Sequence, residues 1–396
     1  KNVTFTLDDT DMQPDDVTAT ESDAMEATAT DTDAAPAYVE QVDPAVDFIR
    51  VGSELSCDEA YRGHLIENEL SSCNRRSEVY ERIRNCRIIV GTVAAISGKP
   101  ELFRLKHFDV AIIDEATQIL EPQLLGILCA RGEDGKDAID KFVLIGDHKQ
   151  LPAVVQQNTE QSAIYDESLL SIGLTNLKDS LFERLYRNCT ATVHRSYDML
   201  CRQGRMHPEV ALFANRAFYG GRLIPVGLPH QIESSDTICR LAFYPSVPEK
   251  AGTSAKINYS EARIVADLAV RIYEDHQTDF DESRTLGIIT PYRSQIALIK
   301  KEIESLGIPA LNRILVDTVE RFQGSERDVI IYSFCVNYPY QLKFLSNLTE
   351  EEGVLIDRKL NVALTRARKQ MFITGVPELL ERNPLYKSLL KLIESF

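Results

Sequence analysis

The stretch Val110–Gln118 reads Val-Ala-Ile-Ile-Asp-Glu-Ala-Thr-Gln and decides the fold. Four apolar residues run without interruption into two adjacent carboxylates, Asp114 and Glu115. The run is too short and too continuously apolar for a surface helix, so it predicts a buried strand of a parallel sheet. Polar residues after such a strand are expected at the carboxyl edge of the sheet, where open α/β sheets bind ligands. Two carboxylates there can hold Mg²⁺ and accept a proton from water, although an acidic helix N-terminus would explain them equally.

The rest of the chain repeats this pattern of apolar runs and amphipathic stretches. Alternation of strand and helix implies right-handed βαβ units and parallel sheets. In the first half, strands are expected at 47–51, 87–93 and 142–147. Helices are expected at 57–85 and between the Asp114 strand and Leu128. In the second half, strands are expected at 192–199, 238–243, 286–290, 314–318, 329–336 and 371–375, and helices at 260–275 and 294–306. We therefore predict two domains, 46–188 and 189–396.

Composition and charge set the limits of what this chain can be. Its 396 residues, 44% of them hydrophobic, suffice for two packed cores. No apolar run reaches the roughly 18 residues of a membrane span, so we expect no membrane partner. The net charge is −16. Residues 1–45 hold 12 acidic residues and one lysine, a net of −11, which leaves −5 for the remainder. An acidic total does not exclude a local basic groove for nucleic acid.

Residues 1–45 are dominated by Asp, Thr, Ala and Glu. Such a composition offers little apolar surface to bury, so we predict that the segment is disordered and dispensable for folding. It is either a solvated linker or an acidic tail that mimics nucleic acid or holds a basic groove closed.

The eight cysteines include no Cys-x-x-Cys pair. This argues against a zinc ribbon or an iron–sulfur cluster within the chain. We expect free, largely buried thiols and an intracellular, cytoplasmic or nuclear location.

Six motifs follow one another in a fixed order. They are Asp114–Thr117 (DEAT), Gly146–Pro152 (GDHKQLP), Arg202–Pro208 (RQGRMHP), Ile289–Gln295 (ITPYRSQ), Asp317–Asp328 (DTVERFQGSERD) and Leu360–Arg368 (LNVALTRAR). Each alone is a modest signal, but the ordered set resembles the motifs of superfamily 1 helicases over residues 46–378. It is most similar to the branch that contains the nonsense-mediated-decay RNA helicase and the replication helicase–nuclease.

The resemblance implies two RecA-like P-loop NTPase domains with parallel sheets, the first one incomplete. ATP would be hydrolysed in the cleft between them and coupled to movement along a strand, usually 5′ to 3′ in this branch. By the same match Asp114 would hold Mg²⁺, Glu115 would be the general base and Gln150 would sense the γ-phosphate. Arg205 and Arg366 would be arginine fingers, whose planar, permanently charged donors suit the transition-state charge. The nucleotide would also be contacted by Asp147, Gln203, Gly324 and Glu326.

Each of these residues also has a simpler interpretation. An Arg is more often a partner in a surface ion pair than a finger, and Gln150 could cap a helix. Their place in an ordered set of motifs favours the catalytic interpretation.

The resemblance also implies a single strand of DNA or RNA as partner. Thr92, Thr290 and Thr318 match positions that touch the phosphate backbone, and such contacts do not specify sequence. A Thr at the end of a strand is as often structural. Motifs do not distinguish RNA from DNA, because the 2′-hydroxyl contacts cannot be read from them.

One expected motif is missing. No Gly-x-x-x-x-Gly-Lys-Ser/Thr occurs, and Gly98-Lys99-Pro100 lacks both the spacing and the hydroxyl. The phosphate cradle should precede the Asp114 strand, so we expect either an upstream part of the same polypeptide that carries the P-loop or a protein that has lost it. The Lys at position 1 favours the first. The sequence thus predicts an ATP-dependent helicase or translocase with ATP and Mg²⁺ as cofactors. The alternative is a non-catalytic nucleic-acid-binding scaffold on a degenerate helicase fold.

Overall fold

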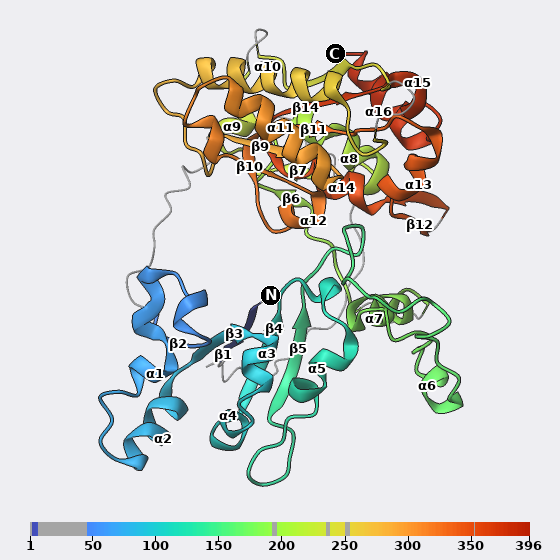
Figure 1. The fold of residues 1–396 in the computed structure, drawn as a ribbon. Helices are drawn as coiled ribbons and strands as arrows, with labels where there is room; N and C mark the ends of the chain where they lie inside the picture. Colours follow the sequence, from blue (N-terminus) through green and yellow to red (C-terminus); the bar gives the residue numbers. More distant parts are fainter. Residues whose placement is uncertain (1, 7–45, 192–195, 235–237, 250–253, 352) are drawn as a thin grey trace, which may run out of the picture. The chain divides into compact units, whose positions relative to one another are not determined.

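The computed structural model describes residues 2–6, 46–191, 196–234, 238–249, 254–351 and 353–396 (Figure 1). The chain forms two compact units. The first comprises Lys1–His148 and Pro152–Tyr197, and the second comprises Lys149–Leu151 and Asp198–Phe396. The main division falls after Tyr197 rather than near residue 188, because helix α7 (Leu181–Thr190) belongs to the first unit. Its Arg184 donates to both carboxylate oxygens of Glu121 and anchors the helix there.

A five-stranded sheet organises the first unit, in the order β2-β3-β1-β4-β5. The pairs β2–β3 and β4–β5 are parallel, as predicted. The bounds are β2 Phe48–Val51, β3 Ile88–Thr92, β4 Phe108–Ile113 and β5 Ile139–Leu144. Strand β5 lies at the edge and is only partly covered, since Val143 is 45% exposed. The strand expected at 142–147 is therefore present as Ile139–Leu144, but at an exposed edge, whereas its apolar sequence would suit a buried strand.

Strand β1 (Asn2–Thr6) corrects the expectation for the N-terminal segment. It lies between β3 and β4 and pairs antiparallel with both, with Val3 opposite Gly91 and Ile113. Its five residues, Asn-Val-Thr-Phe-Thr, alternate polar and apolar and are rich in types that favour strands. The acidic composition of the whole segment concealed this short signal. The disorder predicted for residues 7–45 lies outside the described residues.

The predicted helix 57–85 is interrupted. A 3₁₀ helix covers Glu59–His64, then α1 spans Ile66–Glu69 and α2 spans Arg76–Asn85. The break follows from the start of α2, where the Glu78 carboxylate accepts the backbone N–H of Asn74 and of Arg75. Such an acidic residue at the third helical position fixes an N-terminus.

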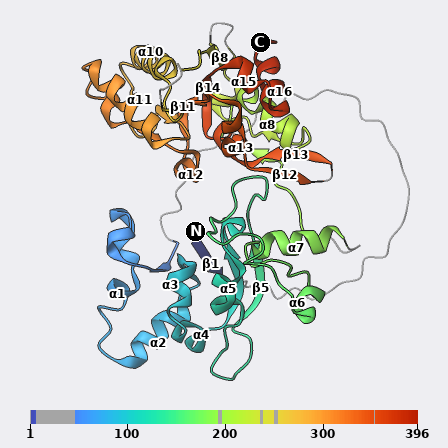
Figure 2. The ribbon, with the colours of Figure 1, turned by 45° about the vertical axis from the view of Figure 1, so that its right-hand side comes forward.

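The remaining helices of the first unit are short. Figure 2 shows α6 and α7 on the β5 side of the sheet. The bounds of the helices not yet given are α3 Val93–Ser97, α4 Glu101–Leu105, α5 Glu121–Leu128 and α6 Glu167–Ser171.

The second unit contains a five-stranded, wholly parallel sheet in the order β10-β9-β11-β14-β8. Its strands are β8 Leu241–Pro245, β9 Leu286–Ile289, β10 Leu315–Asp317, β11 Arg327–Ser333 and β14 Ala367–Gly375. Apolar runs predicted all five. The strand predicted at 192–199 is not formed over 196–199, and residues 192–195 lie outside the described part of the chain.

Helices cover both faces of this sheet. Helices α10 (Tyr259–Asp275) and α11 (Arg293–Ser305) lie side by side in Figure 1. The other helices are α8 Pro208–Phe218, α9 Pro229–Ile232, α12 Val319–Phe322, α13 Leu342–Leu345, α14 Arg358–Leu364, α15 Pro377–Leu380 and α16 Pro384–Ile393. Two small pairs of strands complete the unit, β6 Arg202–Gln203 with β7 Ile224–Pro225, and β12 Leu348–Glu351 with β13 Val354–Asp357.

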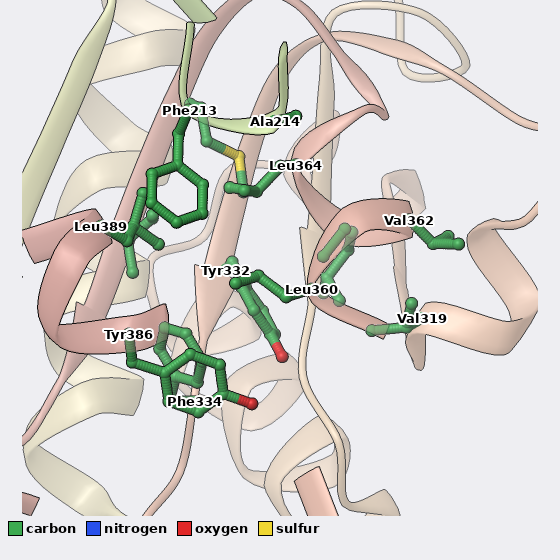
Figure 3. Close-up of a cluster of buried hydrophobic side chains, with 14 of the residues drawn as sticks. Phe213, Ala214, Val319, Tyr332, Phe334, Leu360, Val362, Leu364, Tyr386 and Leu389 are labelled. Carbon is green, nitrogen blue, oxygen red and sulfur yellow. The ribbon is translucent and has the colours of Figure 1, made fainter. Parts of the chain in front are cut away.

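Alternation along β11 divides the core of the second unit. Ile330 and Tyr332 enter one cluster of buried residues, while Val329 and Ile331 enter the cluster under α10 and α11. Figure 3 shows the first cluster, in which Tyr386 of α16 lies beside Phe334. Their ring centroids are 5.0 Å apart. Packing on both faces makes this sheet a rigid support for the loops at its edges.

No helix among the described residues is long and apolar enough to cross a membrane.

Candidate functional site

The two carboxylates of the deciding stretch lie directly after β4. Asp114 is exposed, and its Oδ1 accepts the backbone N–H of Glu115 at 2.9 Å. Glu115 has left-handed backbone angles, φ 52° and ψ 37°, which cost energy for a residue with a Cβ. Strain of this kind concentrates at functional sites. Gln118 Nε2 donates to Glu115 Oε2 at 2.6 Å and so orients the carboxylate.

The second motif of the first unit passes close to the same turn. A Cβ on Gly146 would lie 2.9 Å from Thr117 Cγ2 and 3.0 Å from its backbone nitrogen, so only glycine fits. Asp147 follows and is half-buried. The loops after β4 and β5 therefore meet at one edge of the sheet, as predicted for a ligand site.

Arg366 is a buried arginine of the second unit. It is 2% exposed, and its guanidinium donates to the Val362 carbonyl at 3.1 Å and the Ser325 carbonyl at 3.4 Å. Its Nη2 also lies 3.2 Å from Gln150 Oε1. Gln150 belongs to Lys149–Leu151, the three residues that cluster with the second unit. Two residues predicted to be catalytic, 216 positions apart, are thus in direct contact.

Arg205 and Glu326 form a second pair in the same unit. Arg205 Nε lies 2.6 Å from Glu326 Oε2, and Arg205 Nη1 donates to the Thr365 carbonyl at 3.4 Å. Thr365 directly precedes Arg366, so both predicted fingers lie beside the end of α14. His230 Nε2 lies 2.8 Å from the Arg205 carbonyl oxygen and helps to fix the backbone there.

Positive charge controls the protonation of Glu326. Burial disfavours its charged form, but the hydrogen bond from Arg205 and the charges of Arg205, Arg368 and Arg366 outweigh this and lower its pKa below the ordinary value. Arg368 Nη1 lies 3.7 Å from Glu326 Oε1. We did not single out Arg368 in the sequence, although its position two residues after Arg366 was a usable signal.

The other predicted nucleotide contacts are placed less favourably. The Gln203 amide braces its own turn, since it donates to the Met206 carbonyl and accepts the Met206 N–H. A structural role explains these bonds. Gly324 is exposed with φ +83°, which any residue with a Cβ would adopt only under strain.

The three threonines differ in burial. Thr92 is exposed, and its hydroxyl accepts the Ala95 N–H at 3.2 Å as the N-cap of α3, which is the structural alternative. Thr318 is half-buried at the start of α12. Thr290 is fully buried, and its hydroxyl has no hydrogen-bond partner among the described residues. Thr290 would therefore touch a phosphate only if the residues that cover it moved.

The donor set at Asp114 suits Mg²⁺ that is shared with a nucleotide. Mg²⁺ in such sites takes one or two carboxylates and completes its shell with phosphates and water. Asp114 offers an exposed carboxylate at the edge of the sheet. The described residues contain no group of three or more metal-ligating side chains that could hold an ion alone. Asp114 could thus serve as one carboxylate ligand of such a shared ion.

Family comparisons agree with this geometry. A model described as "AAA domain" matches residues 46–158, and a second with the same description matches residues 177–378. Two α/β units with parallel strands and these motifs define a pair of RecA-like helicase domains. The chain belongs to superfamily 1 helicases, in the branch that includes helicase/nuclease DNA2 and the nonsense-mediated-decay helicase.

Relatives with curated names are similar over most of this chain. It is 31% identical to the probable helicase MAGATAMA 3 of Arabidopsis thaliana, over 77% of this chain and 35% of that protein. It is 30% identical to the DNA replication ATP-dependent helicase/nuclease DNA2 of Xenopus laevis, over 76% of this chain and 28% of that protein. The DNA polymerase alpha-associated DNA helicase A of Saccharomyces cerevisiae is 28% identical, over 77% of this chain and 44% of that protein. The chain thus spans less than half the length of these relatives.

Among solved structures, the arterivirus helicase nonstructural protein 10 in complex with DNA is 14% identical. The match covers 71% of this chain and 41% of that chain, with a TM-score of 0.30.

Proposed function

We propose that this chain forms the motor of an ATP-dependent helicase or translocase that moves along single-stranded DNA or RNA. The observation that carries the proposal is the contact of Gln150 Oε1 with Arg366 Nη2 at 3.2 Å. A residue suited to sensing the γ-phosphate and one suited to neutralising it touch each other. Their pairing supports a shared role in the hydrolysis step.

The side chains can divide the reaction among themselves. Glu115 would accept a proton from the attacking water, and Gln118 would hold that carboxylate in place. Asp114 would hold Mg²⁺, which when bound neutralises charge on the phosphates. Arg366 and Arg205 would stabilise the negative charge that develops on the transferred phosphoryl group.

The proposal needs a phosphate cradle that the sequence does not contain. We propose that another segment of the natural polypeptide supplies a Gly-rich loop with its Lys. Backbone amides of such a loop would bind the β- and γ-phosphates. Without them Asp114 provides only part of a site, so residues 1–396 alone should release no phosphate from ATP.

The test compares two forms of the protein. Phosphate release is measured with and without single-stranded DNA or RNA for residues 1–396 and for the natural polypeptide that includes these residues. We expect release by the natural polypeptide only, stimulated by a strand and abolished by Glu115→Gln. The matched control is Glu133→Gln, an exposed residue in the loop after α5. Rapid, Glu115-dependent phosphate release by residues 1–396 alone would disprove the proposal that another segment must supply the phosphate-binding loop.

The missing cradle also favours a second candidate, a nucleic-acid-binding scaffold without catalysis. A scaffold has no need for the Gln150–Arg366 contact, so strand binding should survive Arg366→Lys and phosphate release should be absent from the natural polypeptide as well. Strand-stimulated release by that polypeptide would exclude the scaffold.

A further inference from the structure

The second unit carries a groove that is lined by residues outside the six motifs. It has a volume of about 780 Å³ and runs along β8 and the ends of α15 and α16. We call it the β8 groove, and its lining includes Glu209, Leu241, Phe243, Glu381, Ile393 and Glu394. Figure 2 shows α15 and α16 next to β8. None of these residues belongs to the six motifs.

One wall of the groove is a strand edge, in which Leu241 is 4% exposed and its carbonyl oxygen accepts a weak hydrogen bond from Cys239 Sγ at 3.7 Å. Within the described residues β8 pairs only with β14 and so forms an edge of the sheet. Met371 N–H donates to the Arg240 carbonyl, and Ser246 N–H donates to the Gly375 carbonyl, each at 2.8 Å. Because a strand alternates its hydrogen-bonding groups between its two sides, Leu241 and Phe243 direct theirs away from β14. Proteins usually shield such an edge or use it for pairing.

The side chains around this edge are apolar at the centre and acidic at the rim. Phe243 and Ile393 are partly buried against the core, while Glu209, Glu381 and Glu394 are exposed. Glu381 Oε2 lies 3.7 Å from Lys387 Nζ in an exposed ion pair. Such a pair contributes little free energy, so Glu381 can leave Lys387 and pair with a ligand at little cost.

The one arginine that lines the groove does not offset this charge. Arg240 is 4% exposed and donates to the Glu233 carboxylate at 3.0 Å. The rim of the groove is therefore negative, and it suits a cationic ligand.

We propose that the β8 groove binds an extended, basic segment of a partner protein, which adds a strand to the free edge of β8. Main-chain bonds to Phe243, and to Leu241 once the weak Cys239 bond to its carbonyl is exchanged, would supply the pairing, as in other recognition by strand addition. Alternate side chains of the segment would point into the apolar centre and towards the three glutamates. The segment would therefore alternate apolar and basic residues.

The experiment uses residues 1–396 and three synthetic decapeptides followed by fluorescence anisotropy. The first alternates Val and Lys, the second has the same composition with five Val followed by five Lys, and the third alternates Val and Glu. Saturable binding is expected for the first, and binding weaker by about tenfold or more for the other two. Equal binding of the first two peptides would show a general attraction to an acidic protein and would overturn the proposal.

Variants locate the binding. Glu209→Lys with Glu394→Lys should weaken the alternating Val-Lys peptide by about tenfold or more, since two of the three rim charges reverse. Glu274→Lys, an exposed residue of α10, is the matched control and should change the affinity by less than about twofold. Unchanged affinity in the double variant would place the peptide elsewhere on the molecule and overturn the proposal.

A modified peptide tests the strand without any change to the protein. The Val-Lys decapeptide is N-methylated at every second residue in each of the two registers, so that the methyl groups lie along one edge of the bound strand in one peptide and along the other edge in the second. We expect the peptide whose methyl groups face β8 to bind about tenfold more weakly and the other peptide to keep its affinity, and equal affinity of the two would overturn the proposal. Sedimentation must also give a monomer. A dimer that the double variant dissociates would assign the groove to a second copy of this chain instead.

Discussion

Arg205 Nε donates to Glu326 Oε2 at 2.6 Å, across 121 residues of chain. The pair is only part-buried, with side-chain exposures of 35% and 41%, so it contributes little to stability. Its more important effect is to hold a guanidinium in one orientation beside the Thr365 carbonyl. A finger that is already oriented loses less entropy when it meets a phosphoryl group.

If Glu326 orients Arg205, the two residues should not act independently. Glu326→Gln and Arg205→Lys should each lower kcat of the natural polypeptide, and the double variant should lose less than the sum of the two effects. We expect a coupling of about 0.5–3 kcal/mol in a double-mutant cycle on kcat. Glu282→Gln, in an exposed pair with Arg313, is the control and should leave kcat unchanged. Strict additivity would mean that the pair has no role in catalysis.

Arg366→Lys should lower kcat far more than it weakens ATP binding. Lysine keeps the charge but cannot reach the Val362 and Ser325 carbonyls and Gln150 with one planar fork. Loss of a finger costs about 10³-fold in related NTPases. The measurement is kcat together with the Kd of a fluorescent ATP analogue. Since Arg366 is buried, thermal unfolding of the variant must be measured in parallel. A kcat within a few-fold of the parent, in a folded variant, would remove Arg366 from the mechanism.

Glu261 should make the stability of the second unit depend on pH. Its carboxylate is fully buried in α10, where it accepts from Ser333 Oγ at 2.7 Å and Cys335 N–H at 2.8 Å. Burial raises the pKa of Glu261 to about 7, against the effect of these hydrogen bonds. The folded state therefore holds the proton more tightly than the unfolded state does. Stability from this site is complete below pH 4.5 and declines as the pH rises to about 7.

Glu261→Gln removes that dependence. Relative to the parent, the variant should gain about 3 kcal/mol in the free energy of unfolding between pH 4.5 and 8, because a tenfold change in proton affinity corresponds to about 1.4 kcal/mol. Urea unfolding at several pH values measures the difference. Glu274→Gln, at an exposed position of the same helix, serves as the control. If the free energies of unfolding of variant and parent differed by the same amount at every pH in this range, the result would contradict the raised pKa of Glu261.

Removal of residues 1–6 should destabilise the first unit. Strand β1 bonds to both β3 and β4, and without it two ladders of backbone groups lose their partners. We expect the Tm of the first unit to fall by about 5 °C or more, given about 2–4 °C per kcal/mol in a domain of this size. The control replaces residues 10–40 with a Gly-Ser linker of equal length, which keeps β1. Equal Tm values for parent and truncated protein would show that β1 adds nothing to the fold.

The elements that could be predicted are those whose signal is local. The apolar runs of β4, β9, β11 and β14 are long enough to be recognised, and each lies in a sheet as expected. Strand β1 was missed because five residues of the right pattern lie at the start of a long acidic segment. The break before α2 was missed because it depends on one carboxylate, that of Glu78, capping a helix within a charged stretch.

The site was predicted as a set of residues and not as a geometry. Motif order identified Gln150, Arg205 and Arg366, but the contact of Gln150 with Arg366 depends on packing between segments 216 residues apart. The burial of Thr290 could not be read from a motif either, since it depends on what covers the end of β9. Local pattern identifies the candidates, and tertiary packing decides which of them reach solvent.

The position of Lys149–Leu151 has a consequence for the modularity of the chain. Leu151 is 5% exposed within the core of the second unit, and the Asn361 side chain donates to the Lys149 carbonyl at 2.9 Å. Residues 198–396 are therefore not a self-sufficient module. A recombination or a protease cut at Tyr197 would separate two products, one with an empty position in its core and the other carrying the tripeptide that belongs there.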